Sequence, residues 1–479
     1  MRFQNRKSRR ESNLPRNPGR DRRGAIVVLT AVMMAVLIGM LAFSLDVGYI
    51  TMARTEIQRA ADSGALAAAG ELGQGMPAAQ SAAVQYVQNN NVTGDLVPTS
   101  DITVEFGQWD DVSRTFVPSV DSPSAVRVFA EQNNRSLFFG RIFGHNTFNV
   151  EAAAIATFSP RDIVVVLDYS ASMNDDSELA HISKLGQTAI EANLLEIYNE
   201  LGAPTFGSMQ WTPTYVASDN VNTVMTALGL DSVAYPYPSG SWSDYINYVK
   251  SNSNINNAGY RKRYGYLTLV NYWLERKPEF DQTPVLWQTS EQPITAVKDA
   301  FSVFLAFMQQ VDTDDRVGLA VYTSDDGTGL LENGLTDNFQ QIEDTSRQRQ
   351  AGHYHSYTNI SAGMQKARVE LENNGRAGAL RMIVLMTDGK ANWHNNSYNP
   401  TAAVNNVRAE AQLAADNGFP IVTISLGADA DAGLMQEAAD ITGGVHFNIP
   451  GGGSVETYEE DLKDVFREIA DKRPLQLVD

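Results

Sequence analysis

The stretch IVVVLDYSAS, residues 163–172, joins a strand pattern to a cluster of oxygen-bearing side chains. Its first five residues are all β-branched or aliphatic, which is the pattern of a parallel strand buried on both faces. The polar residues that follow therefore lie at the carboxyl end of a strand, where open α/β sheets place their ligand sites. Asp168, Ser170 and Ser172 occupy alternate positions and offer only oxygen donors. Such a set favours a hard cation such as Mg²⁺.

Two segments further along the chain place oxygen donors in comparable positions. Thr358 stands just before a helical pattern that spans residues 359–373. Asp388 follows the apolar run MIVLM, residues 382–386, which is another strand pattern. Both side chains are therefore expected at the same edge of the sheet as the first motif.

The three loops resemble the metal-ion-dependent adhesion site of von Willebrand factor type A domains, whose first motif is Asp-x-Ser-x-Ser. The resemblance implies a bound Mg²⁺, or else Mn²⁺ or Ca²⁺, with a carboxylate of a partner protein completing its shell. The five matching positions are Asp168, Ser170, Ser172, Thr358 and Asp388. The long stretch between Ser172 and Thr358 exceeds the usual spacing of that family, which predicts an insertion.

Other interpretations of the first motif are weaker. Asp and Ser after a strand are common as helix caps and turns. A phosphatase of the haloacid dehalogenase type would need a second Asp at position 170, where this chain has Ser170. The sequence shows no clear general base near Asp168, so we expect no enzymatic activity, and a metal-dependent hydrolase is the least favoured alternative.

The N-terminal region has the pattern of a membrane anchor. Residues 1–24 contain nine Lys or Arg and two Asp or Glu, and residues 25–45 contain no charged residue. Twenty-one residues of helix match the roughly 30 Å thickness of a hydrocarbon core. The basic block predicts a cytoplasmic N-terminus, with the rest of the chain exported. The expected location is the bacterial inner membrane, with the bulk of the chain in the periplasm.

The residues around this span carry a second resemblance. The block from Arg22 through Ala69 is similar to the N-terminal segment of TadE/TadG-like proteins of the tight-adherence (Flp) pilus assembly system. That resemblance implies a bitopic envelope protein, and TadG-like members commonly carry a von Willebrand type A domain. The fifth residue after Gly24 is Leu29 rather than the Glu of prepilins, so we expect the helix to be retained as an anchor.

Composition limits the function classes. The chain has no cysteine, which excludes disulfides and thiolate metal sites. Its net charge is −19 although the first 24 residues carry +7, so residues 25–479 are strongly acidic. An acidic exported region argues against binding nucleic acid. Protein partners, such as pilus or envelope components with an exposed carboxylate, are expected instead.

The predicted organisation has five parts. They are a basic tail (1–24), a transmembrane helix (25–45), a juxtamembrane helix (46–72), a small β-rich α+β region (73–160) and a type A domain (161–479). Alternating strand and helix patterns in the last part predict an α/β fold with a Rossmann-like, mostly parallel sheet covered by helices on both faces.

The predicted insertion, at about residues 178–292, interrupts this alternation. It holds four of the six Trp and ten of the eighteen Tyr. Exposed aromatic residues are typical of recognition surfaces, so the insertion is either a lid or specificity surface beside the metal site or a small satellite core that packs its own aromatics.

The expected function is that of a membrane-anchored envelope protein that presents a metal-dependent, adhesion-type protein-binding domain in Flp pilus assembly or surface adhesion. The main alternative is a structural cell-envelope protein whose metal site only stabilises the fold.

Overall fold

The structure is a computed structural model of the chain, and it describes residues 23–110, 113–120, 123–276, 283–310, 314–322, 329–376, 379–451, 454–472 and 475–478. The predicted basic tail lies outside the described residues apart from its last two positions. The chain divides into two compact units. One comprises residues 1–64, 82–104 and 128–154, and the other comprises residues 65–81, 105–127 and 155–479.

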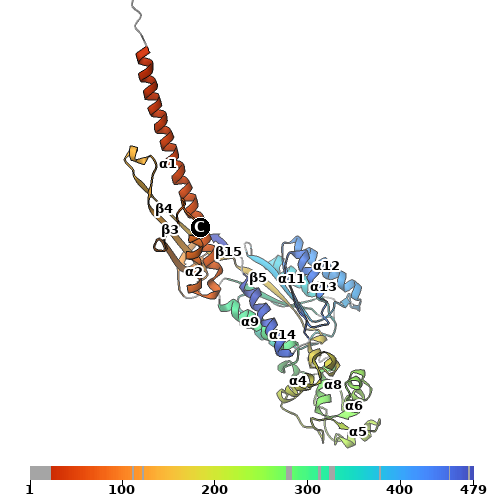
Figure 1. The fold of residues 1–479 in the computed structure, drawn as a ribbon. Helices are drawn as coiled ribbons and strands as arrows, with labels where there is room; N and C mark the ends of the chain where they lie inside the picture. The colour runs from red at the N-terminus through yellow and green to blue at the C-terminus, as the bar shows by residue number, and fades with distance from the viewer. Residues whose placement is uncertain are drawn as a thin grey trace, which may run out of the picture. The chain divides into compact units, whose positions relative to one another are not determined.

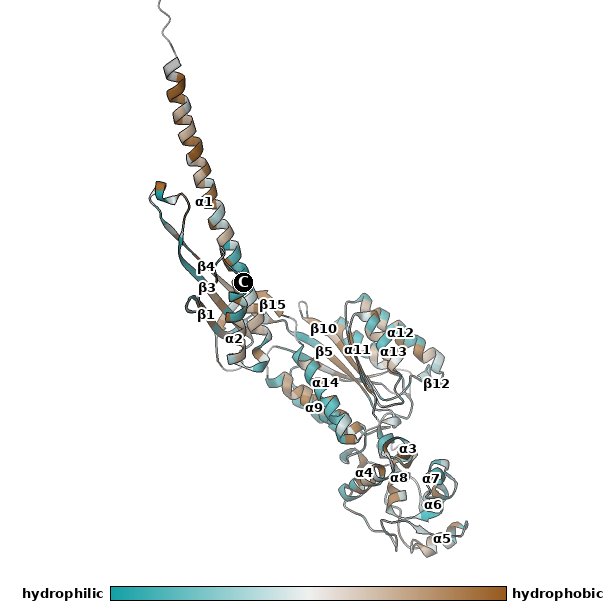
Figure 2. Ribbon diagram, viewed as in Figure 1, coloured by the Kyte–Doolittle hydropathy of each residue, from teal (hydrophilic) through white to brown (hydrophobic). Residues whose placement is uncertain are grey.

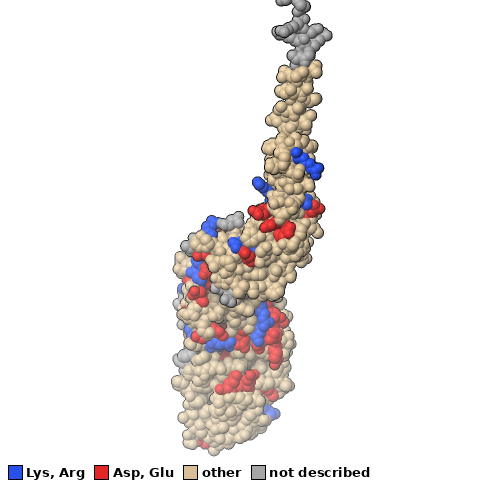
Figure 3. Space-filling model, turned by 90° about the vertical axis from the view of Figure 1, so that its left-hand side faces the viewer, with Lys and Arg blue, Asp and Glu red and all other residues tan. Residues whose placement is uncertain are grey.

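Helix α1, Arg23–Gly70, runs without a break through the predicted span and the predicted juxtamembrane helix. It is the one helix in the described part of the chain that is long and apolar enough to cross a membrane. Large apolar side chains from Ile26 to Leu45 are exposed. Figure 2 shows this stretch in brown, and on the face drawn in Figure 3 it carries neither blue nor red residues. Hydrocarbon is the environment that suits such a surface.

The region after α1 forms helix α2, Met76–Gln88, and a five-stranded sheet in the order β15-β4-β3-β1-β2. The bounds of β1 to β4 are Ile102–Asp110, Thr115–Pro118, Ala125–Ser136 and Thr147–Phe158. Strand β15, Leu475–Val478, comes from the far end of the chain and pairs antiparallel with β4. The sequence analysis did not predict β15, because four residues are too few for an alternating pattern to emerge.

The second sheet has six strands in the order β14-β13-β10-β5-β8-β9 (Figure 1). Their bounds, from β5 onward, are Arg161–Asp168 (β5), Arg316–Tyr322 (β8), Leu330–Thr336 (β9), Leu380–Thr387 (β10), Ile421–Leu426 (β13) and His446–Ile449 (β14). All neighbours pair in parallel except β8 and β9. Strand β5 lies between β10 and β8, so the predicted first motif ends a central strand.

Helices cover both faces of this sheet, as the α/β pattern predicted. Ile163, Val165 and Leu167 of β5 pack with α9 and α14 on one face, while Val164 and Val166 pack with α11, α12 and α13 on the other. The helix bounds are Ile294–Gln310 (α9), Ile360–Asn374 (α11), Pro400–Asp416 (α12), Ala432–Thr442 (α13) and Val455–Asp471 (α14). Burial on both faces explains why β5 reads as a continuous apolar run.

The insertion leaves the sheet after β5 and returns at a narrow neck. The backbone N–H of Asp176 donates to the carbonyl of Gln292 at 3.1 Å, and the backbone N–H of Gln292 donates to the Ser177 hydroxyl at 2.9 Å. Its helices are α3 (Ile182–Leu185), α4 (Gln187–Glu200), α5 (Val221–Ala227), α6 (Trp242–Ser251), α7 (Ser253–Asn257) and α8 (Tyr266–Glu275). They surround a separate core in which Tyr198 stacks on Tyr266 at 4.8 Å between ring centroids. The aromatics thus form the satellite core that one of the two interpretations predicted.

Three local features of the structure were not part of the predicted pattern. Within the insertion, Gly186 adopts a φ of +84° and separates α3 from α4. A positive φ is a conformation that glycine tolerates and that ends a helix. Strand β9 and helix α10, Phe339–Arg347, were not predicted. Strand β9 is an antiparallel edge strand containing polar residues and a glycine, so it lacks the apolar run of its neighbours.

Candidate metal centre

The predicted donors meet at the carboxyl edge of the central sheet. Strand β5 ends at Asp168, β10 ends one residue before Asp388, and α11 begins two residues after Thr358. The hydroxyl oxygens of Ser170 and Ser172 lie 3.1 Å apart. The Ser172 hydroxyl in turn donates to Asp388 Oδ1 at 2.7 Å. These contacts link the first and third loops through their side chains.

Thr358 joins the same cluster across Gly389. A Cβ added to Gly389 would lie 3.5 Å from both the Ser172 and the Thr358 hydroxyl oxygens, so the two hydroxyls flank this residue. A hydrogen bond to the loop after β10 holds Thr358 in place, because the backbone N–H of Thr358 donates to the side-chain oxygen of Asn392 at 2.8 Å. The structure therefore brings all five predicted residues together, and their role as metal ligands stays a prediction.

Asp168 is held rigidly at the base of the cluster. Its side chain is fully buried. One carboxylate oxygen accepts from the backbone N–H of Ser170 at 2.8 Å, and the other accepts from the Thr387 hydroxyl at 2.9 Å. Thr387 was not among the predicted residues. The signal that could have identified it is its position directly before Asp388, at the end of the predicted strand. Its hydroxyl orients a donor rather than adding one.

Electrostatics make this edge of the sheet attractive to a cation. Burial raises the pKa of Asp388 well above its usual range, and the nearby carboxylates of Asp168, Asp175 and Asp176 raise it further. Burial likewise raises the pKa of Asp168. Two buried carboxylates close to one another are unfavourable when both are ionised. The oxygen-only donor set and the accumulated negative charge fit a hard divalent cation.

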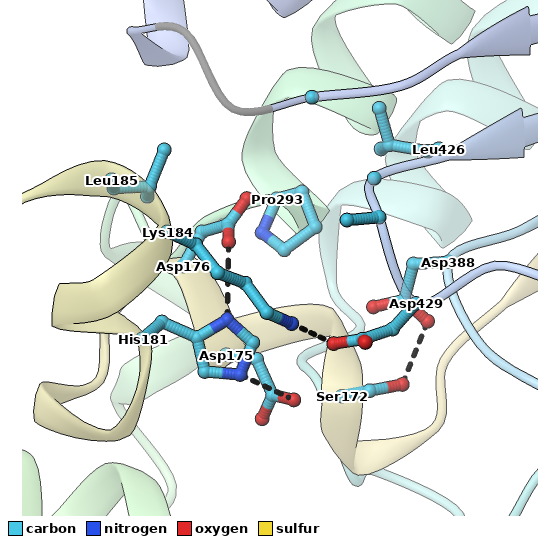
Figure 4. Close-up of a pocket in the computed structure, with 13 residues that line it drawn as sticks. Ser172, Asp175, Asp176, His181, Lys184, Leu185, Pro293, Asp388, Leu426 and Asp429 are labelled. Atoms are coloured by element: carbon cyan, nitrogen blue, oxygen red, sulfur yellow. Dashed lines mark hydrogen bonds and ion pairs between the residues drawn. The ribbon is translucent and has the colours of Figure 1, made fainter.

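A cavity of about 200 Å³ opens beside Ser172 and Asp388, against the first residues of the insertion. Figure 4 shows His181 between Asp175 and Asp176, with Lys184 reaching toward Asp429. Burial alone would lower the pKa of His181, but hydrogen bonds to the two aspartates outweigh it and raise the pKa to about 9. His181 is therefore protonated at neutral pH, which is the wrong state for a general base.

Ser172 also lines a second groove, of about 390 Å³, to which Thr358 contributes as well. Lys390 lines it, is exposed, and has no hydrogen-bond or ion-pair partner among the residues that the structure describes. Tyr398 stands at its margin, and Tyr357 stacks on Trp393 at 4.4 Å between ring centroids. The sequence analysis missed Lys390 and these aromatics because nothing in the local sequence places them beside the first motif.

The fold is that of a von Willebrand factor type A domain, and comparison with known families matches residues 287–460 to that domain. The match begins at the end of the insertion and omits β5, which the structure places at the centre of the same sheet. Residues 24–71 match the Flp pilus-assembly TadE/G-like family, and residues 67–156 match the Tad-like Flp pilus-assembly family. The chain thus joins an N-terminal part that matches Flp pilus-assembly families to a type A domain, and the apolar N-terminal helix that the described residues contain fits a single-pass membrane protein.

A search of curated proteins gave no match. Among solved structures, BatB from Bacteroides thetaiotaomicron is 14% identical, covering 37% of this chain and 89% of that one, with a TM-score of 0.28. The pilus adhesin SpaC from Lactobacillus rhamnosus GG is 12% identical, covering 77% and 34%, with a TM-score of 0.32. The PilB minor pilin from Streptococcus sanguinis is 9% identical, covering 79% and 89%, with a TM-score of 0.36. These scores are too low to support a functional argument.

Proposed function

We propose that this protein is an inner-membrane protein that presents a metal-dependent protein-binding domain on the periplasmic side, in the assembly or adhesion of a Flp-type pilus. The observation that carries the proposal is the convergence of five oxygen-bearing side chains, two of which, Ser172 and Thr358, line a groove. Asp168, Ser170, Ser172, Thr358 and Asp388 would hold Mg²⁺, Mn²⁺ or Ca²⁺. Such an ion supplies an electrophilic centre, since three of the five donors are neutral hydroxyls.

The groove supports a partner that bears a carboxylate. Ser172 and Thr358 line it, so a ligand seated there lies against the donor cluster. Lys390 adds a positive charge at the same place in an otherwise acidic chain. The exposed rings of Tyr357 and Tyr398 offer apolar contact area at low entropic cost. An acidic residue next to an apolar one on the partner fits this surface.

The main alternative is a metal site that only stabilises the fold. The burial of Asp168 and Asp388 favours it, because a closed structural site also buries its carboxylates. The groove of about 390 Å³ that Ser172 and Thr358 line favours adhesion. A hydrolase is the least supported function, since His181 is the imidazole beside Asp388 and its raised pKa keeps it charged.

Capture of partners from envelope extracts separates these functions. The full chain, solubilised in detergent, is expected to retain a partner in millimolar Mg²⁺ and to lose it in EDTA. Asp388→Ala should lose it in both buffers, while Asp464→Ala, on an exposed position of α14, should behave as the wild type. Partner capture that survives both EDTA and Asp388→Ala would leave only the structural role.

Orientation is tested independently by a fusion of alkaline phosphatase after Asp479. The enzyme should be active, because the basic N-terminal block keeps the start of the chain in the cytoplasm. An inactive fusion, together with an active cytoplasmic reporter at the same position, would contradict the exported location and with it the pilus assignment.

A further inference from the structure

The tip of the β3–β4 hairpin, residues 137–146, gathers exposed apolar side chains. Phe138 is 68% exposed, Ile142 is 71% exposed and Phe143 is 49% exposed. Arg141 is exposed among them and has no ion-pair partner in the part of the chain that the structure describes. Figure 2 shows brown at this tip, next to α1. Large apolar side chains concentrated on one short loop indicate a surface that contacts something apolar.

This tip is fixed to helix α1 by a buried carboxylate. Asp46 is 5% exposed, and it accepts the backbone N–H of Phe138 at 2.9 Å and that of Phe139 at 3.1 Å. Gly140 allows the loop to turn back, because a Cβ there would lie 2.4 Å from the carbonyl oxygen of His145. Asp46 is the first charged residue after the uncharged stretch of α1. The hydrogen bonds therefore hold the tip at the end of the apolar span.

Ring contacts place the tip across the boundary of that span. Phe143 makes an edge contact with Phe43, with ring centroids 6.3 Å apart. Phe43 precedes Leu45 by two residues, which corresponds to about 3 Å inside the end of the uncharged stretch at 1.5 Å per residue. On the other side of Asp46, Phe138 contacts Tyr49 at 4.9 Å. Tyr is enriched where hydrocarbon meets headgroups, and Phe is typical of the apolar side of segments that lie in this interface, so the rings on both sides of this level fit such a position.

We propose that the hairpin tip is a second membrane contact. It inserts Phe138, Ile142 and Phe143 into the interface of the leaflet where α1 leaves the bilayer, and Arg141 faces the lipid phosphates. The inference rests on the membrane anchor assigned to α1. The two membrane contacts are joined by Asp46. Together they restrict the rotation of the unit that contains α1 and the hairpin about the axis of α1.

The absence of cysteine makes a direct test possible. Single variants Ile142→Cys, Leu96→Cys and Ile38→Cys in the full chain each give one site for a nitroxide label. Leu96 is 59% exposed in the same unit and serves as the matched aqueous control, while Ile38 lies within the span. After reconstitution into vesicles of phosphatidylethanolamine and phosphatidylglycerol, the ratio of oxygen to nickel-chelate accessibility should be severalfold higher at position 142 than at 96.

The controls keep the anchor and the tip distinguishable. If the accessibility ratio at position 38 is not high, α1 does not lie in the membrane and the anchor itself is wrong. If the ratio is high at 38 but the ratio at 142 is as low as that at 96, the tip faces water and the proposal is overturned. Dipolar broadening at 142 that disappears on dilution with unlabelled chain would show contact with a second copy and would also overturn it. In the Ile142→Cys background, Asp46→Ala should lose the oxygen preference, whereas Asp46→Asn, which keeps an acceptor, should retain it.

Discussion

The two ends of strand β5 bury an aspartate each, and the surroundings of the two carboxylates are opposite. At the amino end, Asp162 accepts from Arg316 Nη2 at 2.9 Å and from Arg376 Nη2 at 2.8 Å. Next to it, Arg161 pairs with Asp315 at 2.9 Å in a fully buried contact. At the carboxyl end, Asp168 is surrounded by hydroxyls and by a second carboxylate.

The carboxyl groups at the two ends also have pKa values shifted in opposite directions. Burial alone would raise the pKa of Asp162, but hydrogen bonds from Arg316 and Arg376 outweigh it and lower the pKa. For Asp388, burial raises the pKa and the charge of Asp168 adds to the effect. At one end, the chain supplies the cations that its buried acids need. At the other, no cationic side chain among the described residues pairs with Asp168 or Asp388, which is expected where the cation comes from solution.

The largest expected effect comes from Asp162→Asn. The substitution keeps the shape of the side chain but leaves Arg316 and Arg376 without their shared anion. Removing one partner of a buried ion pair costs about 3–5 kcal/mol, and the partial exposure of both arginines places this case near 3 kcal/mol. Urea unfolding of the full chain in detergent measures the change in the free energy of unfolding.

The matched control is Asp168→Asn on the same strand, measured in EDTA. It removes a charge that pairs with no cationic side chain among the described residues. The loss in the free energy of unfolding should therefore be much smaller than for Asp162→Asn, and the variant can even be more stable than the wild type. Equal losses for the two variants would mean that the carboxyl end is also a structural ion-pair site.

The next effect is stabilisation by the metal. A cation that binds only the folded chain adds about 2.7 kcal/mol at a hundredfold excess over Kd. Mg²⁺ should therefore raise the melting temperature by roughly 5–10 °C for a domain of this size. Asp168→Asn and Asp388→Asn should abolish the shift, and Asp162→Asn should retain it although the protein is less stable. An unchanged melting curve of the wild type in millimolar Mg²⁺ or Mn²⁺ would contradict a functional site.

Partner capture should respond to Lys390. Lys390→Glu places a negative charge beside the groove, and a change of this size at an interface rim lowers affinity by roughly tenfold, mainly through the association rate. The Mg²⁺ shift should remain. Lys472→Glu, which follows α14 near the amino end of the sheet, is the matched control and should leave capture unchanged. Identical affinities for the two variants would remove Lys390 from the binding surface.

The sequence predicted the parts of the fold that depend on local patterns. Buried runs such as residues 163–167 gave the strands of the central sheet, and the position of Asp168, Thr358 and Asp388 after or before regular elements gave the candidate site. Strand β15 and strand β9 were missed, because one is very short and the other is a polar edge strand whose pairing is decided by tertiary structure.

Long-range electrostatics were also beyond local patterns. The partners of Asp162 come from β8 and from residue 376, far along the chain. His181 and Lys390 reach the candidate site from the insertion and from the loop after β10, and neither belongs to the motif that identified the site. The sequence therefore indicated which side chains are oxygen donors but not which charges surround them.

The smallest expected effect is a pH dependence at the neck of the insertion. His181 faces Asp175, Asp176 and Lys184, and Asp388 and Asp429 line the same cavity. Because its folded pKa of about 9 lies above the ordinary value of about 6.5, protonated His181 stabilises the fold fully below pH 6.5, and this contribution is lost as the pH rises through 9. After discounting for solvent screening, this contribution to the free energy of unfolding is expected to be about 1 kcal/mol.

In EDTA, His181→Gln should therefore destabilise the chain at pH 6 and have little effect at pH 9.5, as measured by urea unfolding. A His181→Gln effect of the same size at both pH values would mean that packing, and not the charge held between the two aspartates, fixes the insertion beside the candidate metal site.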